Sequence, residues 1–214
     1  MRVIGITGGV GAGKSAILKY LTAISGVRVV EADEVGHLLM EPGMECFEKI
    51  RAHFGERVLT PDGQLDRAAV AKIVFADKKE LDWQNELMHP AIKNWIRREI
   101  EKERQQGACA LFVVEAALLI EDHYEELCEE FWYIYTEPEI RRARLKESRG
   151  YSDEKIDAIF RKQCTDAEFR THCAQVIDNN STKEAVYERV DILLGKLGIH
   201  TTHQEVGGQA VLGR

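Results

Sequence analysis

Five short apolar runs recur along the chain, and each ends in polar or glycine-rich residues. They occupy residues 3–7, 27–30, 110–115, 131–135 and 176–178. Short β-branched and aromatic runs of this kind, separated by helical segments, predict a parallel sheet flanked by helices. The run at 110–115 is apolar up to its final acid, so we expect it to be buried on both faces in the middle of the sheet. The pattern therefore predicts an α/β fold.

Four helical segments lie between or after these runs. One covers residues 16–21, one starts at Pro138, one starts after Ser152, and the last covers 183–197. Proline suits the first turn of a helix, and serine is a favoured N-cap, so both residues mark helix starts. We expect the helix after Ser152 to continue to about residue 163.

The longest stretch without a strand pattern runs from 34 to 106. It is polar and helical in pattern, with breaks predicted at 42–43, 60–63 and 89–90, where proline or glycine occurs. A connection of this length exceeds an ordinary crossover between strands. We expect a helical insertion that holds an acceptor substrate; the alternative is a structural lobe with no binding role.

Composition narrows the class of protein. The chain has 214 residues, of which 44% are hydrophobic, enough for one α/β domain with a sizeable core. The formal net charge of -7 argues against nucleic acid or an acidic membrane as the main partner. The longest apolar stretch, at 108–120, contains Glu115 and is too short for a membrane span.

The cysteines and the N-terminal residues bear on the compartment. Five cysteines occur with no C-x-x-C pair, and the first residues are too soon interrupted by glycine to form a signal peptide. We therefore expect a cytoplasmic protein in a reducing environment, with the cysteines acting as small buried hydrophobic residues.

The segment 8–15 carries the clearest chemistry. It reads G-x-x-x-x-G-K-S, between the first predicted strand and the first predicted helix, which is the context that a phosphate-binding P-loop requires. Backbone N–H groups and the positive end of the helix dipole bind phosphate, Lys14 adds a mobile charge, and the Ser15 hydroxyl is a ligand for Mg²⁺. The alternative is a glycine-rich turn that matches by chance. We expect the nucleotide to be bound by Gly11, Ala12, Gly13, Lys14, Ser15 and Ala16.

Asp33 follows the second predicted strand, at the edge of the sheet where ligands bind in open α/β folds. The segment 33–36 reads D-x-x-G, as in GTPases, but it lies too near Lys14 for a switch segment, and no N-K-x-D motif occurs. These features argue against a GTPase. The Asp33 carboxylate can accept a proton from a substrate hydroxyl and hold it in line; alternatively it caps the helix that follows.

Two further groups of charged residues are open to two interpretations. Arg141, Arg144 and Arg149 would pair with the oxygens of a transferring phosphoryl group, or form a solvated basic face. Arg141 and Arg144 share a helical face at a spacing of three. Glu115, at the end of a buried strand, would hold Mg²⁺ through water or cap the next loop.

The sequence also resembles the dephospho-CoA kinase family over almost all of residues 1–199. The P-loop alone is shared by many families, whereas the order of the other motifs is particular to this one. They are Glu31-Ala32-Asp33, Glu41-Pro42-Gly43, Phe54-Gly55, Asp62-Gly63-Gln64-Leu65-Asp66-Arg67, Val74-Phe75, Leu87-Met88-His89-Pro90, Leu118-Leu119-Ile120-Glu121, the three arginines, Gln163 and Ile177-Asp178-Asn179.

The resemblance implies roles for five residues. Asp33 matches the acid proposed to act on the ribose hydroxyl of the acceptor, and Arg144 and Arg149 match arginines on the lid side of the site. Arg67 and His89 lie in the part that receives dephospho-CoA. The catalytic residues would then be Lys14, Asp33, Arg144 and Arg149. The substrate would be bound by Asp33, Arg67 and His89.

Four positions depart from the family pattern. Ala16 replaces a common threonine, Glu31 and Glu115 replace frequent aspartates, and Ala117 replaces the proline usual before Leu-Leu. Ser15 still provides the metal-binding hydroxyl, so we expect activity.

The resemblance implies a kinase that transfers the γ-phosphoryl group of ATP, with Mg²⁺, to the ribose 3′-hydroxyl of dephospho-CoA. Two alternatives are another nucleotide or nucleoside kinase and a non-catalytic nucleotide-binding module. We expect a monomer whose single P-loop kinase domain covers 1–199. It would comprise a core at 1–33, 107–140 and 173–199, the insertion at about 34–106, a lid at about 141–172, and a disordered tail at 200–214.

Overall fold

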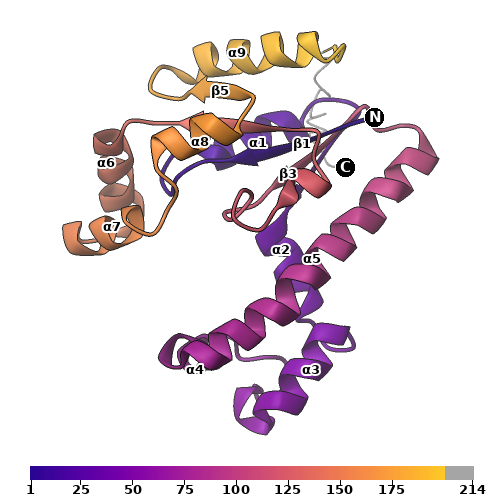
Figure 1. Cartoon of the computed structure of the whole chain (residues 1–214), viewed down its shortest axis with the longest axis vertical. Helices are drawn as coiled ribbons and strands as arrows, with labels where there is room; N and C mark the ends of the chain where they lie inside the picture. The colour runs from indigo at the N-terminus through magenta and orange to yellow at the C-terminus, as the bar shows by residue number, and fades with distance from the viewer. Residues whose placement is uncertain (201–214) are drawn as a thin grey trace, which may run out of the picture.

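The structure, a computed structural model, describes residues 1–200 of the chain. Its single sheet has five strands, all parallel, in the order β2-β3-β1-β4-β5 (Figure 1). The strands are β1 Arg2–Thr7, β2 Val27–Glu31, β3 Leu111–Glu115, β4 Glu130–Tyr135 and β5 Gln175–Asp178. Each of the five apolar runs forms a strand, which confirms the α/β fold expected from the pattern.

One expectation about the sheet is wrong. The central strand is β1, and β3 lies between β1 and the edge strand β2. All residues of β3 are buried, but full burial is common to every inner strand of a parallel sheet, so it does not identify the middle one.

Helices cover both faces of the sheet because the side chains of β1 alternate between two cores. Ile4 and Ile6 belong to a core that includes buried residues of α1 (Lys14–Thr22) and α9 (Lys183–Lys196). Val3 belongs to a second core, which includes buried residues of α2 (Ala32–Leu39), α5 (Lys78–Gln106) and α8 (Asp166–His172). These packed faces hold the carboxyl ends of the strands in fixed positions.

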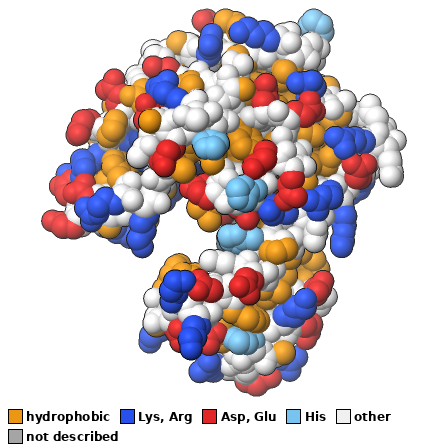
Figure 2. Space-filling model, viewed as in Figure 1, with side chains coloured by type: hydrophobic (Ala, Val, Ile, Leu, Met, Phe, Trp, Pro, Cys, Tyr) orange, Lys and Arg blue, Asp and Glu red, His pale blue; other side chains and the backbone are white. Residues whose placement is uncertain are grey.

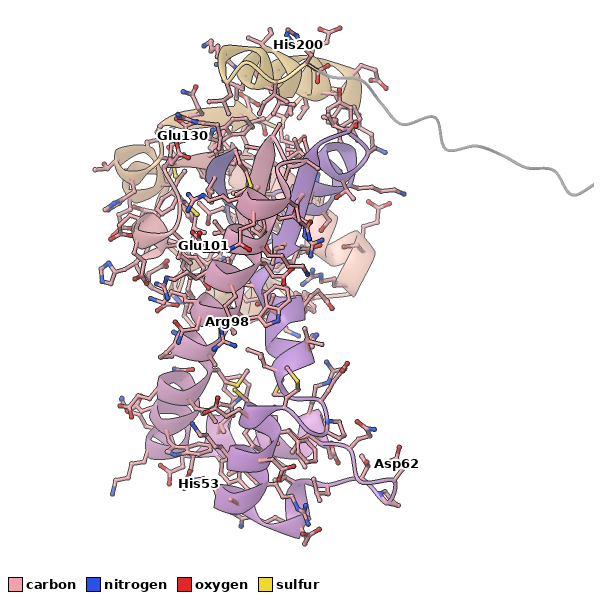
Figure 3. All side chains as sticks on the ribbon, turned by 90° about the vertical axis from the view of Figure 1, so that its right-hand side faces the viewer. His53, Asp62, Arg98, Glu101, Glu130 and His200 are labelled. Atoms are coloured by element: carbon pink, nitrogen blue, oxygen red, sulfur yellow. The ribbon has the colours of Figure 1, made fainter. Side chains whose placement is uncertain are left out.

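The insertion extends away from the sheet (Figure 1). After α2, its elements are α3 (Glu45–Phe54), the 3₁₀ turn η1 (Glu56–Val58), α4 (Arg67–Ala76) and α5. Figure 3 places His53 and Asp62 at the end farthest from the sheet, whereas Glu130 begins strand β4 of the sheet. Contacts of α5 with α2 and α4 connect the two ends.

The break expected at 89–90 is absent. The helix α5 has 29 residues and includes Pro90 in its interior. A proline inside a helix removes one backbone hydrogen bond and strains the preceding turn. Burial of Met88, Ile96 and Ile100 on either side of the proline stabilises the continuous helix.

The segment between β4 and β5 contains three helices. They are α6 (Pro138–Arg149), α7 (Asp153–Phe160) and α8. Pro138 is in the first turn of α6 and the Ser152 side chain caps α7, as predicted, although α7 ends at Phe160 and not near 163. The sequence analysis missed α8, which starts with a capping box formed by Thr165 and Glu168.

Several other expectations concern the surface and the ends. Within residues 1–200, no helix combines the length and apolar character needed to cross a membrane. All five cysteines are free, and only Cys164 is not buried. The sequence analysis predicts a disordered tail at 200–214. Residues 201–214 lie outside the described part of the chain.

Candidate active site

The loop between β1 and α1 is held from behind by polar side chains. The Ala12 carbonyl accepts hydrogen bonds from Thr136 Oγ1 at 2.9 Å and Asn179 Nδ2 at 2.7 Å. Thr136 and Asn179 follow β4 and β5, so residues at the ends of two neighbouring strands fix this peptide. Gly13 caps α1 in the left-handed conformation, with φ 84°, where other residues are strained. The loop is therefore pre-shaped at a helix N-terminus, where an anion is favoured.

Lys14 is partnered within the protein. Its Nζ donates to the Gly8 carbonyl at 2.8 Å and lies 3.5 Å from Glu115 Oε1. Burial lowers the pKa of Lys14, and the Glu115 carboxylate opposes that shift. Burial likewise raises the pKa of Glu115, while Lys14 opposes it. The two groups thus limit each other's desolvation cost at the base of the loop.

A cavity of about 590 Å³, the P-loop cavity, opens in front of this loop. Lys14 and Ser15 line it from the start of α1, and Arg144 and Arg149 line it from α6. Gly11, Gly13, Asp33 and Glu115 also line it. Ala12 and Ala16 do not line it; Ala12 is buried, and its carbonyl is bonded to Asn179. The cavity combines anion-binding groups with four acidic residues, which are Glu31, Asp33, Glu115 and Glu147.

A second cavity, of about 300 Å³, lies between α2, α5 and the loop after β3; we name it the α2–α5 cavity. Its walls are apolar at Met40, Met88 and Ile92. Asp33 and Ala117 line both cavities. Figure 2 shows the surface hollowed between the sheet-bearing part and the far end of the insertion. Asp33 therefore lies at the junction of an anion-binding cavity and a largely apolar one.

Asp33 is in the first turn of α2, where the helix dipole favours its negative charge. The N-cap residue of this helix is Glu31, and no side chain caps it by a hydrogen bond. The capping role considered for Asp33 therefore finds no hydrogen bond among the described residues. Asp33 also raises the pKa of Lys14 as one of several nearby charges, so the two groups interact electrostatically.

His89 projects from α5 into the α2–α5 cavity and has a defined partner. Its Nδ1 lies 3.3 Å from Asp122 Oδ1, and both residues line the cavity. Lys93, one turn further along α5, donates to the Asp122 carbonyl at 2.9 Å. Asp122 could not be found from local sequence patterns, because its partner His89 lies 33 positions away on the insertion.

Arg67 lies apart from the other predicted residues. It starts α4 and lines a small cavity of about 270 Å³. His37 and Met40 line both this cavity and the α2–α5 cavity. The structure thus brings Arg67 to a space next to the one that holds His89, and away from the P-loop.

The three arginines do not act alike. Arg144 lines the P-loop cavity and donates to the Asn179 carbonyl at 3.2 Å, and Arg149 lines the same cavity. Arg141 does not line the cavity and instead binds the loop itself, through the Val10 carbonyl at 2.9 Å. None of the three forms an ion pair with an acid within residues 1–200.

A P-loop follows the first strand of a parallel sheet, and it shares a cavity with arginines of α6 that adjoins a second cavity. These features define the protein as a P-loop kinase. Comparison with known proteins then identifies the family. A model of the dephospho-CoA kinase family matches residues 2–184. The chain belongs to the dephospho-CoA kinase family.

Individual relatives agree. The chain is 35% identical to a dephospho-CoA kinase of Dehalococcoides mccartyi over 194 residues, which is 90% of this chain and 96% of that protein. It is 31% identical to the enzyme of Idiomarina loihiensis over 203 residues, covering 95% and 98%. The members of this family are ATP-dependent phosphotransferases, and phosphorylation of dephospho-CoA is the final step of coenzyme A biosynthesis.

Solved structures show the same fold. The TT1252 protein of Thermus thermophilus is 28% identical, with a TM-score of 0.73 over 92% of this chain and 97% of that one. A dephospho-CoA kinase from Campylobacter jejuni superimposes with a TM-score of 0.69 over 92% and 98% of the two chains, at 21% identity.

Proposed function

We propose that this chain transfers the γ-phosphoryl group of ATP to the ribose 3′-hydroxyl of dephospho-CoA across the junction of the two cavities. ATP would occupy the P-loop cavity, and dephospho-CoA would occupy the α2–α5 cavity and extend toward Arg67. The observation that carries this proposal is that Asp33 lines both cavities. A carboxylate at the junction can touch the acceptor hydroxyl and still lie next to the phosphates.

Each side chain would have a distinct role. The loop N–H groups and Lys14 bind the β- and γ-phosphates, and Lys14 exchanges the Gly8 carbonyl for a phosphate oxygen. Arg144 and Arg149, which line the same cavity, neutralise the charge that spreads over the transferring group. Asp33 accepts a hydrogen bond from the acceptor hydroxyl, orients it and takes its proton as the new bond forms.

The acceptor would be held by residues of the insertion. Met40, Met88 and Ile92 offer apolar contacts, and His89 offers a hydrogen-bonding nitrogen. Arg67 would bind an anionic group of the acceptor, which carries a diphosphate. This division of labour corresponds to a core at 1–33, 107–140 and 173–199, an acceptor-binding insertion at 34–106 and a lid at 141–172.

Magnesium fits the donor set of the P-loop cavity. Within residues 1–200 there is no cluster of three or more His, Cys, Asp or Glu side chains suited to a metal ion. Mg²⁺ in kinases is instead held by one or two protein oxygens and by the phosphates, and it neutralises their charge. Ser15, exposed on the cavity wall, would provide the hydroxyl, and Glu115 would contact the ion through water. A cytoplasmic location and a monomeric state stay predictions.

The test is the rate of ADP release from Mg²⁺–ATP, measured with dephospho-CoA and separately with a panel of nucleosides and nucleotides. The proposal predicts ADP release that depends on dephospho-CoA. It also predicts a product that carries the phosphate at the ribose 3′ position. A nucleoside kinase would respond to the panel instead. A non-catalytic module would bind ATP and release no ADP with any acceptor.

A further inference from the structure

Arg141 and Gln163 hold both polar backbone groups of one P-loop residue. Arg141 Nε donates to the Val10 carbonyl at 2.9 Å, and Gln163 Oε1 accepts from the Val10 N–H at 3.2 Å. Arg141 Nη2 also donates to Gln163 Oε1 at 2.7 Å, which closes the network. Val10 lies at the tip of the loop, whereas Arg141 is on α6 and Gln163 follows α7. Two of these hydrogen bonds connect the predicted lid directly to the loop, and the third joins Arg141 to Gln163 within the lid.

The Arg141 guanidinium lies in a slot that fits it closely. Phe160 covers it on one side, with the guanidinium carbon 4.2 Å from the ring centre. Gly9 also lies against it, because an added Cβ there would be 2.3 Å from the same carbon. Gly9 has no positive φ, so its backbone conformation does not require glycine. Its lack of a side chain is instead what admits the guanidinium.

The charge of Arg141 is not neutralised by a carboxylate. Within residues 1–200 no acid lies within ion-pair distance of Arg141, whereas the next residue, Arg142, pairs with Asp153 and Asp157. Burial lowers the pKa of Arg141, and its charge contributes to lowering the pKa of Lys14. A half-buried positive charge without an acidic partner, close to an anion-binding loop, is balanced when that loop binds an anion.

We propose that Arg141, together with Gln163, is a positioning residue that fixes the Val10 peptide and so holds the P-loop in the shape that binds the triphosphate. Its charge adds to the attraction for the triphosphate without direct contact, because Arg141 does not line the P-loop cavity. Lid and loop then act as one unit in ATP binding. This inference rests on the proposed function only in taking ATP as the ligand of the loop.

The experiment compares Arg141→Met with Arg142→Met, a matched control on the same helix. Calorimetry gives the Kd of Mg²⁺–ATP, and steady-state assays give kcat and the KM for dephospho-CoA. Loss of a charge-assisted hydrogen bond and of a nearby charge predicts a Kd at least about tenfold higher for Arg141→Met. In Arg141→Met the KM for dephospho-CoA should stay within about twofold of the parent. In Arg142→Met both the Kd for ATP and the KM for dephospho-CoA should stay within about twofold of the parent.

Two further variants separate positioning from general stability. Arg141→Lys keeps the charge but cannot span Val10 and Gln163, so it should recover only part of the affinity. Gln163→Leu should raise the Kd for ATP by about threefold or more, and the Arg141→Met/Gln163→Leu double variant should bind ATP about as well as Arg141→Met alone. If Arg141→Met does not fold, Gln163→Leu decides by itself.

Unchanged ATP affinity in Arg141→Met, or in Gln163→Leu where that variant decides, would overturn the inference. So would full recovery by Arg141→Lys together with additive effects in the double variant, because these would leave only a general charge effect. The binding measurement needs no acceptor. A parent protein that binds ATP but does not phosphorylate dephospho-CoA would therefore refute the proposed function and leave the role of Arg141 intact.

Discussion

The ammonium group of Lys14 lies 3.5 Å from the Glu115 carboxylate and donates a hydrogen bond to the Gly8 carbonyl at 2.8 Å. The Lys14 side chain is only 16% exposed. Lys14, which would bind the phosphates, is thus held at the end of β3, beside the cavity in which it would act. It needs only to exchange partners when the triphosphate binds.

Replacing Lys14 by alanine is expected to reduce turnover by at least about a hundredfold, because one preorganised charge is lost where negative charge develops. Circular dichroism should show an intact fold, since Lys14 contributes no apolar side chain to either core. The measurement is ADP release with dephospho-CoA. Near-parental turnover would refute the P-loop assignment.

The same variant makes a prediction about pH. Burial raises the pKa of Glu115, and the charge of Lys14 opposes that rise. Without Lys14, the folded-state pKa of Glu115 is raised further above its unfolded value. A carboxyl group with a raised pKa contributes stability that is present at low pH and lost as pH rises through the folded-state pKa. The difference in Tm between parent and Lys14→Ala should therefore be larger at pH 8 than at pH 5; a difference independent of pH would contradict the pairing.

In alanine variants of Arg144 and Arg149, the fold decrease in kcat is expected to exceed the fold increase in the KM for ATP. Both arginines act on charge that develops during transfer. Arg144 also donates to the Ala12 and Asn179 carbonyls. Its variant should therefore show the larger rise in KM of the two. Steady-state kinetics with varied ATP check both statements. An effect confined to the KM for ATP would make them ground-state binding residues.

Asp122 is expected to affect acceptor binding through His89, to which it is paired. His89→Ala and Asp122→Asn should each raise the KM for dephospho-CoA by about threefold to tenfold, with the Kd for ATP within about twofold of the parent. Glu126→Gln is the control, because Glu126 binds Lys93 and Arg97 outside the cavity. Equal losses in the control would mean that the network only stabilises the fold.

Local patterns in the sequence predicted the features that depend on neighbouring residues. Apolar runs marked all five strands, and the glycine spacing marked the P-loop, because burial and backbone turns are determined locally. The T-x-x-E pattern at Thr165 would also have indicated α8. The continuity of α5 through Pro90 could not be predicted in this way, since it depends on packing along both halves of the helix.

Pairs that are distant in sequence were beyond such patterns. His89 was found through its motif, but Asp122 becomes its partner only when α5 packs beside the loop after β3. Arg141 and Arg144 share a helical spacing, yet one binds the loop backbone and the other lines the cavity. Periodicity places both side chains toward the same side, and the difference depends on Gly9 and Phe160, which provide a slot for one guanidinium only.

The central claim is that Asp33, at the junction of the two cavities, acts on the acceptor hydroxyl. Asp33→Asn tests it most directly, because asparagine keeps the shape of the side chain but lacks the charge and the basicity. We expect a Tm within about two degrees of the parent, ATP binding nearly unchanged, and transfer to dephospho-CoA lower by about 10² or more. A variant that loses stability and keeps most of its turnover would contradict the account and return Asp33 to a structural role.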